Sequence, residues 1–380
     1  MAATDSYAGG DGRLSPLSTP SATRAVLEAH GIGTKYTLGQ NFLVNDDVLK
    51  KIIALAEVGE NDRVLEVGPG IGTLTIALLK HAASVIAIER DPDLPAVLAD
   101  TLHPWREKFA LIEKDALDVT RDDIVAAMVE IGGDTGYPDR ASSAANETAQ
   151  WAVSQSEDCL SESGYPVAPP QEDLQLSLPS KLVANLPYAV AATVVLDYFE
   201  SFPFLDSATI MVQKEVADRM AAAVGTKNYG AYTVKLGLYA EPAGRFAVGP
   251  GNFFPPPRVD SAVIRLNRRV PLMADGAPAS PEVIAAAALM ADAAFTNRRK
   301  TIANSCKTYF SGRGPILLGV ADSSAAEGAP TIALPDGAAT AERLPAIFEA
   351  AAIDPRRRGE TLTQQEFLAL GAALLRVTAA

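Results

Sequence analysis

The sequence Arg63-Val-Leu-Glu-Val-Gly-Pro-Gly-Ile-Gly72 joins a short apolar segment to a glycine-rich turn. The apolar half predicts a strand, and the residues after the turn, Thr73–His81, predict a helix. A second predicted strand, Val85–Ile88, follows and is closed by Glu89. This order of strand, glycine turn, helix, strand and acid is typical of an open α/β sheet that binds a cofactor at the carboxyl ends of its strands, with the acid on a ribose diol.

The turn favours S-adenosylmethionine over a nicotinamide dinucleotide. Gly68-Pro-Gly-Ile-Gly72 does not fit Gly-x-Gly-x-x-Gly, because Thr73 occupies the last position, so a pyrophosphate cradle is not expected. Gly68 and Gly70 let the backbone approach the cofactor closely. Glu66 precedes the turn and is expected near the methionine amino group. A nicotinamide dehydrogenase is the alternative, but no evident proton-transfer residue accompanies this pattern.

A third strand is predicted over Ala110–Glu113, and Asp115 follows it. At the carboxyl end of a strand, an acid can accept a hydrogen bond from the amino group of the cofactor adenine. The alternative interpretation is an ordinary helix cap.

The segment Asn185-Leu-Pro-Tyr188 ends another predicted buried strand, Lys181–Ala184. An exocyclic amine on a base is a poor nucleophile because its lone pair is delocalised into the ring. If the Asn185 side-chain oxygen and the Leu186 carbonyl both accept from it, they favour the geometry that frees the lone pair. Pro187 fixes the turn, and Tyr188 offers a ring face to a base removed from its stack. The alternative is a plain strand–turn–helix junction with Asn185 as a cap.

Phe253 lies before Pro255-Pro-Pro257. Consecutive prolines are excluded from a central strand ladder, so they predict a stiff loop between strands. A ring held on such a loop can close over a flipped base opposite Tyr188. The alternative is an aromatic side chain packed beneath the loop.

The chain has 380 residues and a net charge of −13. An acidic balance disfavours nucleic-acid binding, since phosphate contacts depend on Lys and Arg. However, residues 121–180 hold eleven acidic and two basic residues, whereas residues 253–310 hold eight basic and four acidic ones. A local basic face is therefore expected. Arg298-Arg-Lys300, placed on a predicted helix, is its main candidate for RNA phosphate contact, and Arg356–Arg358 is a second; the alternative for such a run is a solvated face.

No apolar run is long enough to span a membrane, and the first residues lack a signal pattern, so we expect a cytoplasmic protein without membrane contact. The three histidines stand singly, without metal-ligand spacing, so no metal site is expected. Residues 1–23 are rich in Ser, Thr, Gly, Ala and Pro, which predicts a disordered tail.

Taken together, these motifs resemble the rRNA adenine N6,N6-dimethyltransferase family. The resemblance covers nearly all of residues 36–307 and resumes near Arg357-Gly-Glu-Thr-Leu362. The motifs that carry it, in the family's order and spacing, are Gln40-Asn-Phe-Leu43, Glu66-Val-Gly-Pro-Gly70, Glu89, Asp115, Asn185-Leu-Pro-Tyr188, Gln213–Met220, Tyr229-Gly-Ala-Tyr232, Phe253–Ser261 and Phe295–Thr301.

The resemblance implies an α/β protein. Its parts would be a Rossmann-like, class I S-adenosylmethionine-dependent methyltransferase domain with a seven-stranded sheet, over residues 24–270, and a small all-helical C-terminal domain that engages RNA, over 271–380. It implies cofactor contacts by Asn41, Leu43, Gly68, Glu89, Asp115 and Asn185, and the glycine turn adds Glu66 and Gly70 to the expected contacts. It also implies acceptors for the target amine at Asn185 and Leu186, and a stacking pair at Tyr188 and Phe253.

The branch that this chain resembles most is bacterial and dimethylates two adjacent adenosines in the 3′-terminal hairpin loop of 16S rRNA. The expected substrate is 16S rRNA in an immature 30S subunit, and the expected protein is a monomer. Two alternatives remain open, namely a 23S rRNA dimethyltransferase that confers macrolide resistance, and a protein that acts mainly as a 30S assembly factor.

Two segments depart from the family pattern. An acidic, low-complexity insertion is expected at about residues 130–178, and an Ala-, Gly- and Pro-rich insertion at about 312–340. Both leave the site motifs intact. An acidic loop beside an RNA path would repel phosphate, so the insertions bear on RNA docking more than on methyl transfer.

Overall fold

In the computed structural model of the protein, residues 12–32, 41–132, 178–319 and 331–379 are described. Seven strands form a central sheet: β2 Arg63–Val67, β3 Ser84–Ile88, β4 Phe109–Ile112, β5 Lys181–Asn185, β6 Ser207–Gln213, β7 Ala240–Val248 and β9 Ser261–Arg268. Their order is β4-β3-β2-β5-β6-β9-β7. The strands β2 to β6 run parallel, whereas β9 is antiparallel to both β6 and β7. This confirms the predicted seven-stranded Rossmann-like sheet.

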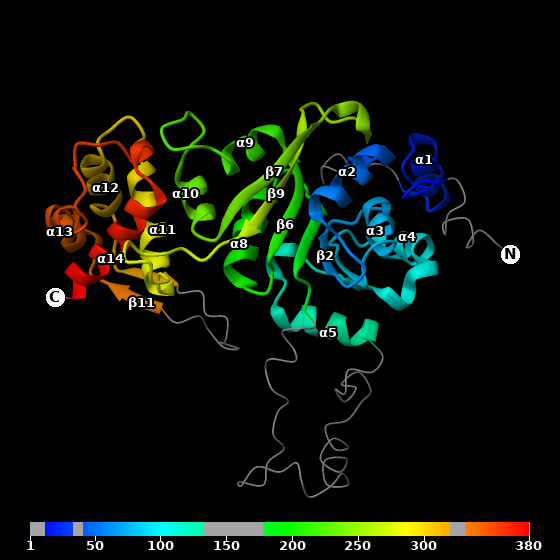
Figure 1. Ribbon diagram of the computed structural model, residues 1–380, viewed down its shortest axis with the longest axis horizontal. Helices are drawn as coiled ribbons and strands as arrows, with labels where there is room; N and C mark the ends of the chain where they lie inside the picture. The colour runs from blue at the N-terminus through cyan, green and yellow to red at the C-terminus, as the bar shows by residue number, and fades with distance from the viewer. Residues whose placement is uncertain (1–11, 33–40, 133–177, 320–330, 380) are drawn as a thin grey trace, which may run out of the picture.

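Helices pack on both faces of the sheet (Figure 1). Successive side chains of a strand point to opposite faces, so Val64 and Val183 enter one core while Leu65 and Leu182 enter the other. The first core also receives side chains from α1 Pro20–Ala29, α2 Asp46–Ala56, α3 Thr73–Leu79 and α4 Leu94–Thr101. The second receives them from α5 Arg121–Gly132, α8 Ala191–Ser201, α9 Lys214–Met220 and α10 Ala231–Gly237.

The C-terminal region lies at the end of the molecule opposite α1 (Figure 1). Its helices are α11 Pro281–Phe295, α12 Ile302–Phe310, α13 Gly337–Ala350 and α14 Gln364–Ala379. Their core also includes Tyr229 and Val234, which precede the predicted domain boundary at residue 270. Within the described ranges, no helix is long and apolar enough to cross a membrane.

The predicted helical C-terminal region is confirmed, but it is not all-helical, because β10 Ile316–Gly319 and β11 Thr331–Leu334 form an antiparallel pair. Ile316 and Leu318 are buried while Leu317 between them is 66% exposed, which is the alternation that a half-buried strand requires. Both strands fall within the expected insertion at 312–340, of which residues 320–330 lie outside the described part. Residues 133–177 of the other expected insertion also lie outside it.

The prediction of a disordered tail is wrong for residues 12–23. Leu17 and Thr23 are fully buried, and the Thr19 hydroxyl accepts a hydrogen bond from the Ala22 N–H to cap α1. This segment is ordered because Leu17 supplies apolar area to the first core and the N–H groups of Leu14 and Ser15 donate to Asp46 of α2. Residues 1–11 lie outside the described part.

A separate two-stranded antiparallel sheet pairs β1 Phe42–Leu43 with β8 Phe253–Phe254. Phe42 lies opposite Phe254, and Leu43 opposite Phe253. The prolines at 255–257 follow β8 and lie in a loop before β9, as their sequence predicts. The pairing brings two parts of the expected site together.

Candidate active site

The carboxyl ends of the parallel strands surround a pocket of about 510 Å³. Chain order reverses between β2 and β5, and such a switch point is the usual ligand site of an open α/β sheet. The volume lies in the range of ligand pockets, roughly 300–1,000 Å³. The pocket is lined by every residue expected to contact the cofactor, namely Asn41, Leu43, Glu66, Gly68, Gly70, Glu89, Asp115 and Asn185.

The glycine turn has the backbone geometry that its sequence predicts. Gly68, Gly70 and Gly72 have φ values of 70°, 60° and 89°, a region that side chains disfavour. A Cβ atom on Gly70 would lie 3.2 Å from the Phe42 ring, and one on Gly68 would lie 3.5 Å from Cδ of Pro187. The turn therefore approaches both β1 and the Asn-Leu-Pro-Tyr segment, and the positive φ values disfavour a side chain at either glycine.

Glu89 stands at the end of β3 and is 9% exposed. Its Oε1 accepts hydrogen bonds of 2.9 Å from the N–H groups of Arg90 and Asp91. Burial raises the pKa of this carboxyl, against the opposing effect of the N–H groups of Asp91, Arg90 and Gly70. These backbone donors orient the carboxylate at the pocket wall, where a ribose diol can donate to its remaining lone pairs.

Asp115 follows β4 and has two protein partners. Its Oδ2 forms a 2.8 Å ion pair with Nη1 of Arg90, and its Oδ1 accepts from the Leu117 N–H at 3.1 Å. The Arg90 guanidinium lowers the pKa of this carboxyl. Asp115 therefore caps a short helical turn, as the alternative interpretation held. It also lines the pocket, and its contact with the cofactor adenine stays a prediction.

Glu66 is a completely buried acid beneath the glycine turn. Its side chain is 1% exposed, and its Oε2 forms no hydrogen bond with another described residue. Burial raises the pKa of Glu66 to about 8, although the Thr75 hydroxyl lies close enough to oppose this rise. An unsatisfied buried carboxyl oxygen needs a donor, and the ammonium group of a methionine-containing cofactor would supply one. The residues present therefore fit S-adenosylmethionine.

The protonation of Glu66 predicts a pH-dependent stability. Between pH 4.5 and about 8 the native carboxyl holds a proton that the unfolded chain has lost, so this group makes the free energy of unfolding fall as pH rises. The fall amounts to about 1.4 kcal/mol per pH unit at most. Glu66→Gln is neutral throughout and removes the effect. Melting temperatures measured from pH 5 to 8 should therefore decline more steeply for the native chain, and parallel curves would contradict the prediction.

The Asn185 amide has one orientation in this site. Its Nδ2 donates to the Asn41 carbonyl at 3.3 Å, and a carbonyl can only accept. Its Oδ1, which accepts from no described residue, is left for a ligand. The next residue, Leu186, donates its N–H to the Met211 carbonyl at 3.1 Å, while its own carbonyl receives no hydrogen bond within the described part. Both line the pocket, so two unused acceptors occur in consecutive residues.

Pro187 and Tyr188 complete the pocket wall at this segment. The Pro187 carbonyl accepts from the N–H groups of Val190 and Ala191, which ties the turn to the start of α8. The Tyr188 hydroxyl is 2.6 Å from Oγ of Ser261 at the start of β9. Tyr188 is thereby tethered to the far end of the proline loop.

Phe253 is not among the residues that line the pocket. Its side chain is 3% exposed and packs in the first core. The alternative interpretation, an aromatic packed beneath a proline loop, describes this arrangement. A role in base stacking would need the ring to become accessible when RNA binds, so that role stays a prediction.

The basic residues at 298–300 lie in the turn between α11 and α12, so their predicted placement on a helix is wrong. The helix α11 ends at Phe295, and Thr301 caps the next helix, α12, its hydroxyl accepting from the Asn304 N–H. Nε of Arg298 forms a 2.8 Å ion pair with Oε2 of Glu360, and its Nη2 donates a hydrogen bond to the Thr226 carbonyl. Arg299 and Lys300 are exposed, and neither forms an ion pair with another described residue.

Sequence reasoning missed several residues of the pocket wall, among them Phe42, Arg90 and Gln213. Phe42 packs on Gly70, Arg90 pairs with Asp115, and Gln213 ends β6. The signal for Gln213 lies in its position, because it ends a strand of the parallel sheet, where ligand contacts gather.

Comparison with known proteins places the chain in a family. The sequence model of a family described as ribosomal RNA adenine dimethylase matches residues 33–329. The chain is 32% identical over 361 residues to the ribosomal RNA small subunit methyltransferase A of Geobacillus sp. (strain WCH70), covering 95% of this chain and 98% of the relative. It is 33% identical over 362 residues to the protein of that name in Enterococcus faecalis (strain ATCC 700802 / V583), covering 94% and 96%.

Among solved structures, a dimethyladenosine transferase from Plasmodium falciparum has a similar fold. The TM-score is 0.53 at 20% sequence identity, over 87% of this chain and 95% of that one. This likeness is one of fold. With the family match over most of the sequence and relatives that align along nearly its whole length, the chain belongs to the ribosomal RNA adenine dimethylase family of methyltransferases.

Proposed function

We propose that this protein dimethylates the N6 amino groups of two adjacent adenosines in the 3′-terminal hairpin loop of 16S rRNA. S-adenosylmethionine is the methyl donor, the substrate is an immature 30S subunit, and the protein acts as a cytoplasmic monomer. The relatives reported above carry a small-subunit name, which supports 16S over 23S rRNA.

The observation that carries this proposal is the pair of unused acceptors at the end of β5. Asn185 Oδ1 and the Leu186 carbonyl belong to consecutive residues of the pocket wall. An adenine amino group has two N–H bonds, so it can donate one to each acceptor. The bond from Asn185 Nδ2 to the Asn41 carbonyl holds the acceptor in place before the base arrives, which is the preorganisation on which catalysis by positioning depends.

The remaining pocket residues account for the cofactor and the base. S-adenosylmethionine supplies an electrophilic methyl group, and Glu66, Glu89 and Asp115 offer carboxyl groups around the glycine turn. Tyr188, held by Ser261, presents a ring against which the adenine can stack, and Phe253 is its proposed counterpart.

Transfer of labelled methyl groups tests the substrate. Immature 30S particles that lack the modification, and separately 23S rRNA fragments, should be incubated with the native chain and the modified nucleotides mapped. We expect dimethyladenosine at the paired 3′-terminal positions of 16S rRNA. Transfer to 23S rRNA instead would support the resistance alternative. Cofactor binding without transfer to either RNA would support a role in assembly.

Arg299 and Lys300 are the proposed phosphate contacts within the C-terminal region. Replacing both with alanine should weaken binding of the RNA hairpin and reduce the slope of log K against log salt by about one unit per residue. The comparison is the exposed pair Arg106 and Lys108, whose replacement should change neither quantity. Filter binding at several salt concentrations measures both, and an unchanged slope would remove these residues from the RNA path.

A further inference from the structure

The pairing of β1 with β8 joins the two halves of the proposed reaction centre. β1 follows Asn41, whose carbonyl orients the Asn185 amide, and β8 carries Phe253. Each strand has only two residues, and a ladder that short has little stability of its own. Other contacts must therefore hold this pair in register.

Asn45 and Asn252 supply those contacts from the residues that flank the two strands. Asn45 Nδ2 donates to Asn252 Oδ1 at 2.8 Å, and the Val44 N–H donates to the Asn252 carbonyl, also at 2.8 Å. Asn252 Nδ2 donates to the Gly249 carbonyl at 2.8 Å. The backbone carbonyl and both ends of the Asn252 side chain are thus engaged.

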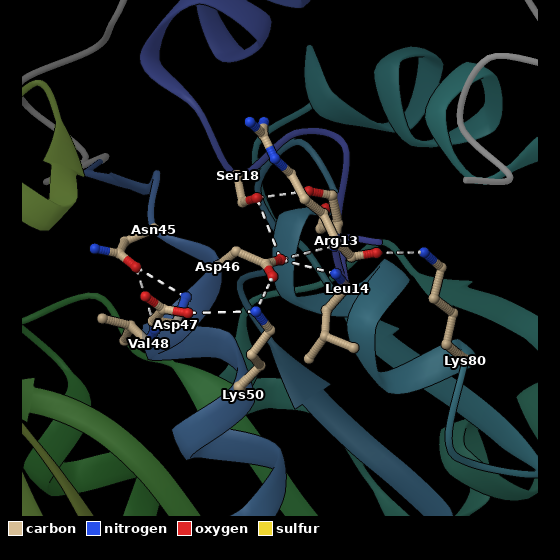
Figure 2. A network of polar contacts seen from close by, with 10 residues as sticks. Arg13, Leu14, Ser18, Asn45, Asp46, Asp47, Val48, Lys50 and Lys80 are labelled. Carbon is tan, nitrogen blue, oxygen red and sulfur yellow. Dashed lines mark hydrogen bonds and ion pairs between the residues drawn. The ribbon is translucent and has the colours of Figure 1, made fainter. Parts of the chain in front are cut away.

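Asn45 is itself held by the first turn of α2. Its Oδ1 accepts from the N–H groups of Asp47 at 2.9 Å and Val48 at 3.3 Å, as Figure 2 shows. These bonds fix which end of the amide faces Asn252, since only Nδ2 remains to donate. Asn45 therefore caps α2 through its Oδ1 and binds Asn252 through its Nδ2, so the two contacts can be removed separately.

Asp46 anchors the same turn to the N-terminal segment (Figure 2). Its Oδ1 accepts from the N–H groups of Leu14 at 2.8 Å and Ser15 at 3.2 Å, and its Oδ2 pairs with Lys50 at 3.1 Å. From α1, Arg24 places its guanidinium 5.1 Å from the centre of the Phe254 ring. The residues around the β1–β8 pair are thus fixed from outside the pocket.

We propose that Asn45 and Asn252 are positioning residues for methyl transfer. They hold the start of the 249–261 loop against residues 41–44, which we call the cofactor segment because Asn41 and Leu43 are expected cofactor contacts. The hydrogen bond between Tyr188 and Ser261 holds the other end of the loop. Together these contacts set the distance between the cofactor segment and the loop that carries Phe253. This inference rests on the proposed function, because it concerns the geometry of that same reaction.

Asn45→Ser and Asn252→Ala separate positioning from stability. Serine is nearly as good a helix cap as asparagine, but it is too short to reach Asn252. Because a misplacement of about 1 Å can cost about a hundredfold in rate, each variant should lower kcat for methyl transfer by about tenfold to a hundredfold, with a much smaller change in KM for S-adenosylmethionine. The double variant should be no slower than the slower single one, since both remove the same contact.

Ser280→Ala is the matched control. Ser280 caps α11 through its bond with the Val283 N–H, in the C-terminal region, so its loss should lower the melting temperature without changing kcat. Single-variant rates within twofold of the native rate, or rate losses that multiply in the double variant, would overturn the proposal.

Hydrogen exchange gives a second readout that needs no RNA substrate. In either variant, peptides covering residues 41–44 and 249–254 should lose protection together, with or without S-adenosylmethionine. If the native chain methylates no rRNA but this joint loss is seen, the proposed function fails while the Asn45–Asn252 contact stands. Unchanged protection in both variants would overturn the contact itself, whatever the substrate.

Discussion

Asn185→Ala is expected to lower kcat for rRNA methylation about a hundredfold to a thousandfold, the usual cost of removing one preorganised polar partner from a reacting group. The variant loses the Oδ1 acceptor, and it also loses the bond that ties Asn185 to the Asn41 carbonyl. The Leu186 carbonyl alone would then hold the amino group. Single-turnover transfer of labelled methyl groups measures the effect without interference from product release.

Asn267→Ala is the control for this variant. Asn267 lies in the same sheet, opposite Ser207 at the start of β6 and therefore far from the carboxyl ends of the parallel strands. Its replacement should leave kcat within about twofold. If Asn185→Ala kept a tenth or more of the native rate, the acceptor role of Asn185 would have to be abandoned.

Glu89→Ala should produce the largest loss of cofactor affinity. A hydrogen bond to a charged group contributes about 1.5–3 kcal/mol, so loss of the ribose contact alone should weaken S-adenosylmethionine binding by roughly tenfold to two-hundredfold. The N–H groups of Arg90 and Asp91 would also lose their shared acceptor. Titration calorimetry measures the dissociation constant directly.

Glu113→Ala provides the comparison, because Glu113 is an exposed acid just past β4 and does not line the pocket. It should bind the cofactor like the native chain. Equal affinities for the Glu89 and Glu113 variants would place the ribose elsewhere in the pocket.

The sheet and most of the pocket could be predicted because their signals are local. Apolar runs such as Lys181–Ala184 mark buried strands, and the positive φ values of Gly68 and Gly70 are geometries that glycine adopts readily. Polar residues at the ends of those strands then meet at one edge of the sheet. Local sequence was therefore enough to predict that Glu89, Asp115 and Asn185 lie at one edge of the sheet.

The rest depended on contacts between distant segments. Residues 12–19 are ordered because they pack on the first core and because Asp46 accepts hydrogen bonds from their backbone. A Ser- and Gly-rich composition does not reveal these contacts. The burial of Phe253 comes from its pairing with Leu43. Arg298 is held by Glu360 in a turn, whereas its sequence neighbours suggested a helix. Tertiary contacts override local preference at each of these places.

The β1–β8 pairing also bears on when the site can form during synthesis. Asn45 and Asn252 are separated by 207 residues, so their contact closes a long loop and carries the entropy cost of doing so. A chain made from its N-terminus exposes the cofactor segment early, but that segment gains its partner strand only after Phe254 has emerged from the exit tunnel. A nascent chain that stops before β8 would therefore have the glycine turn and Glu89 without a complete reaction centre.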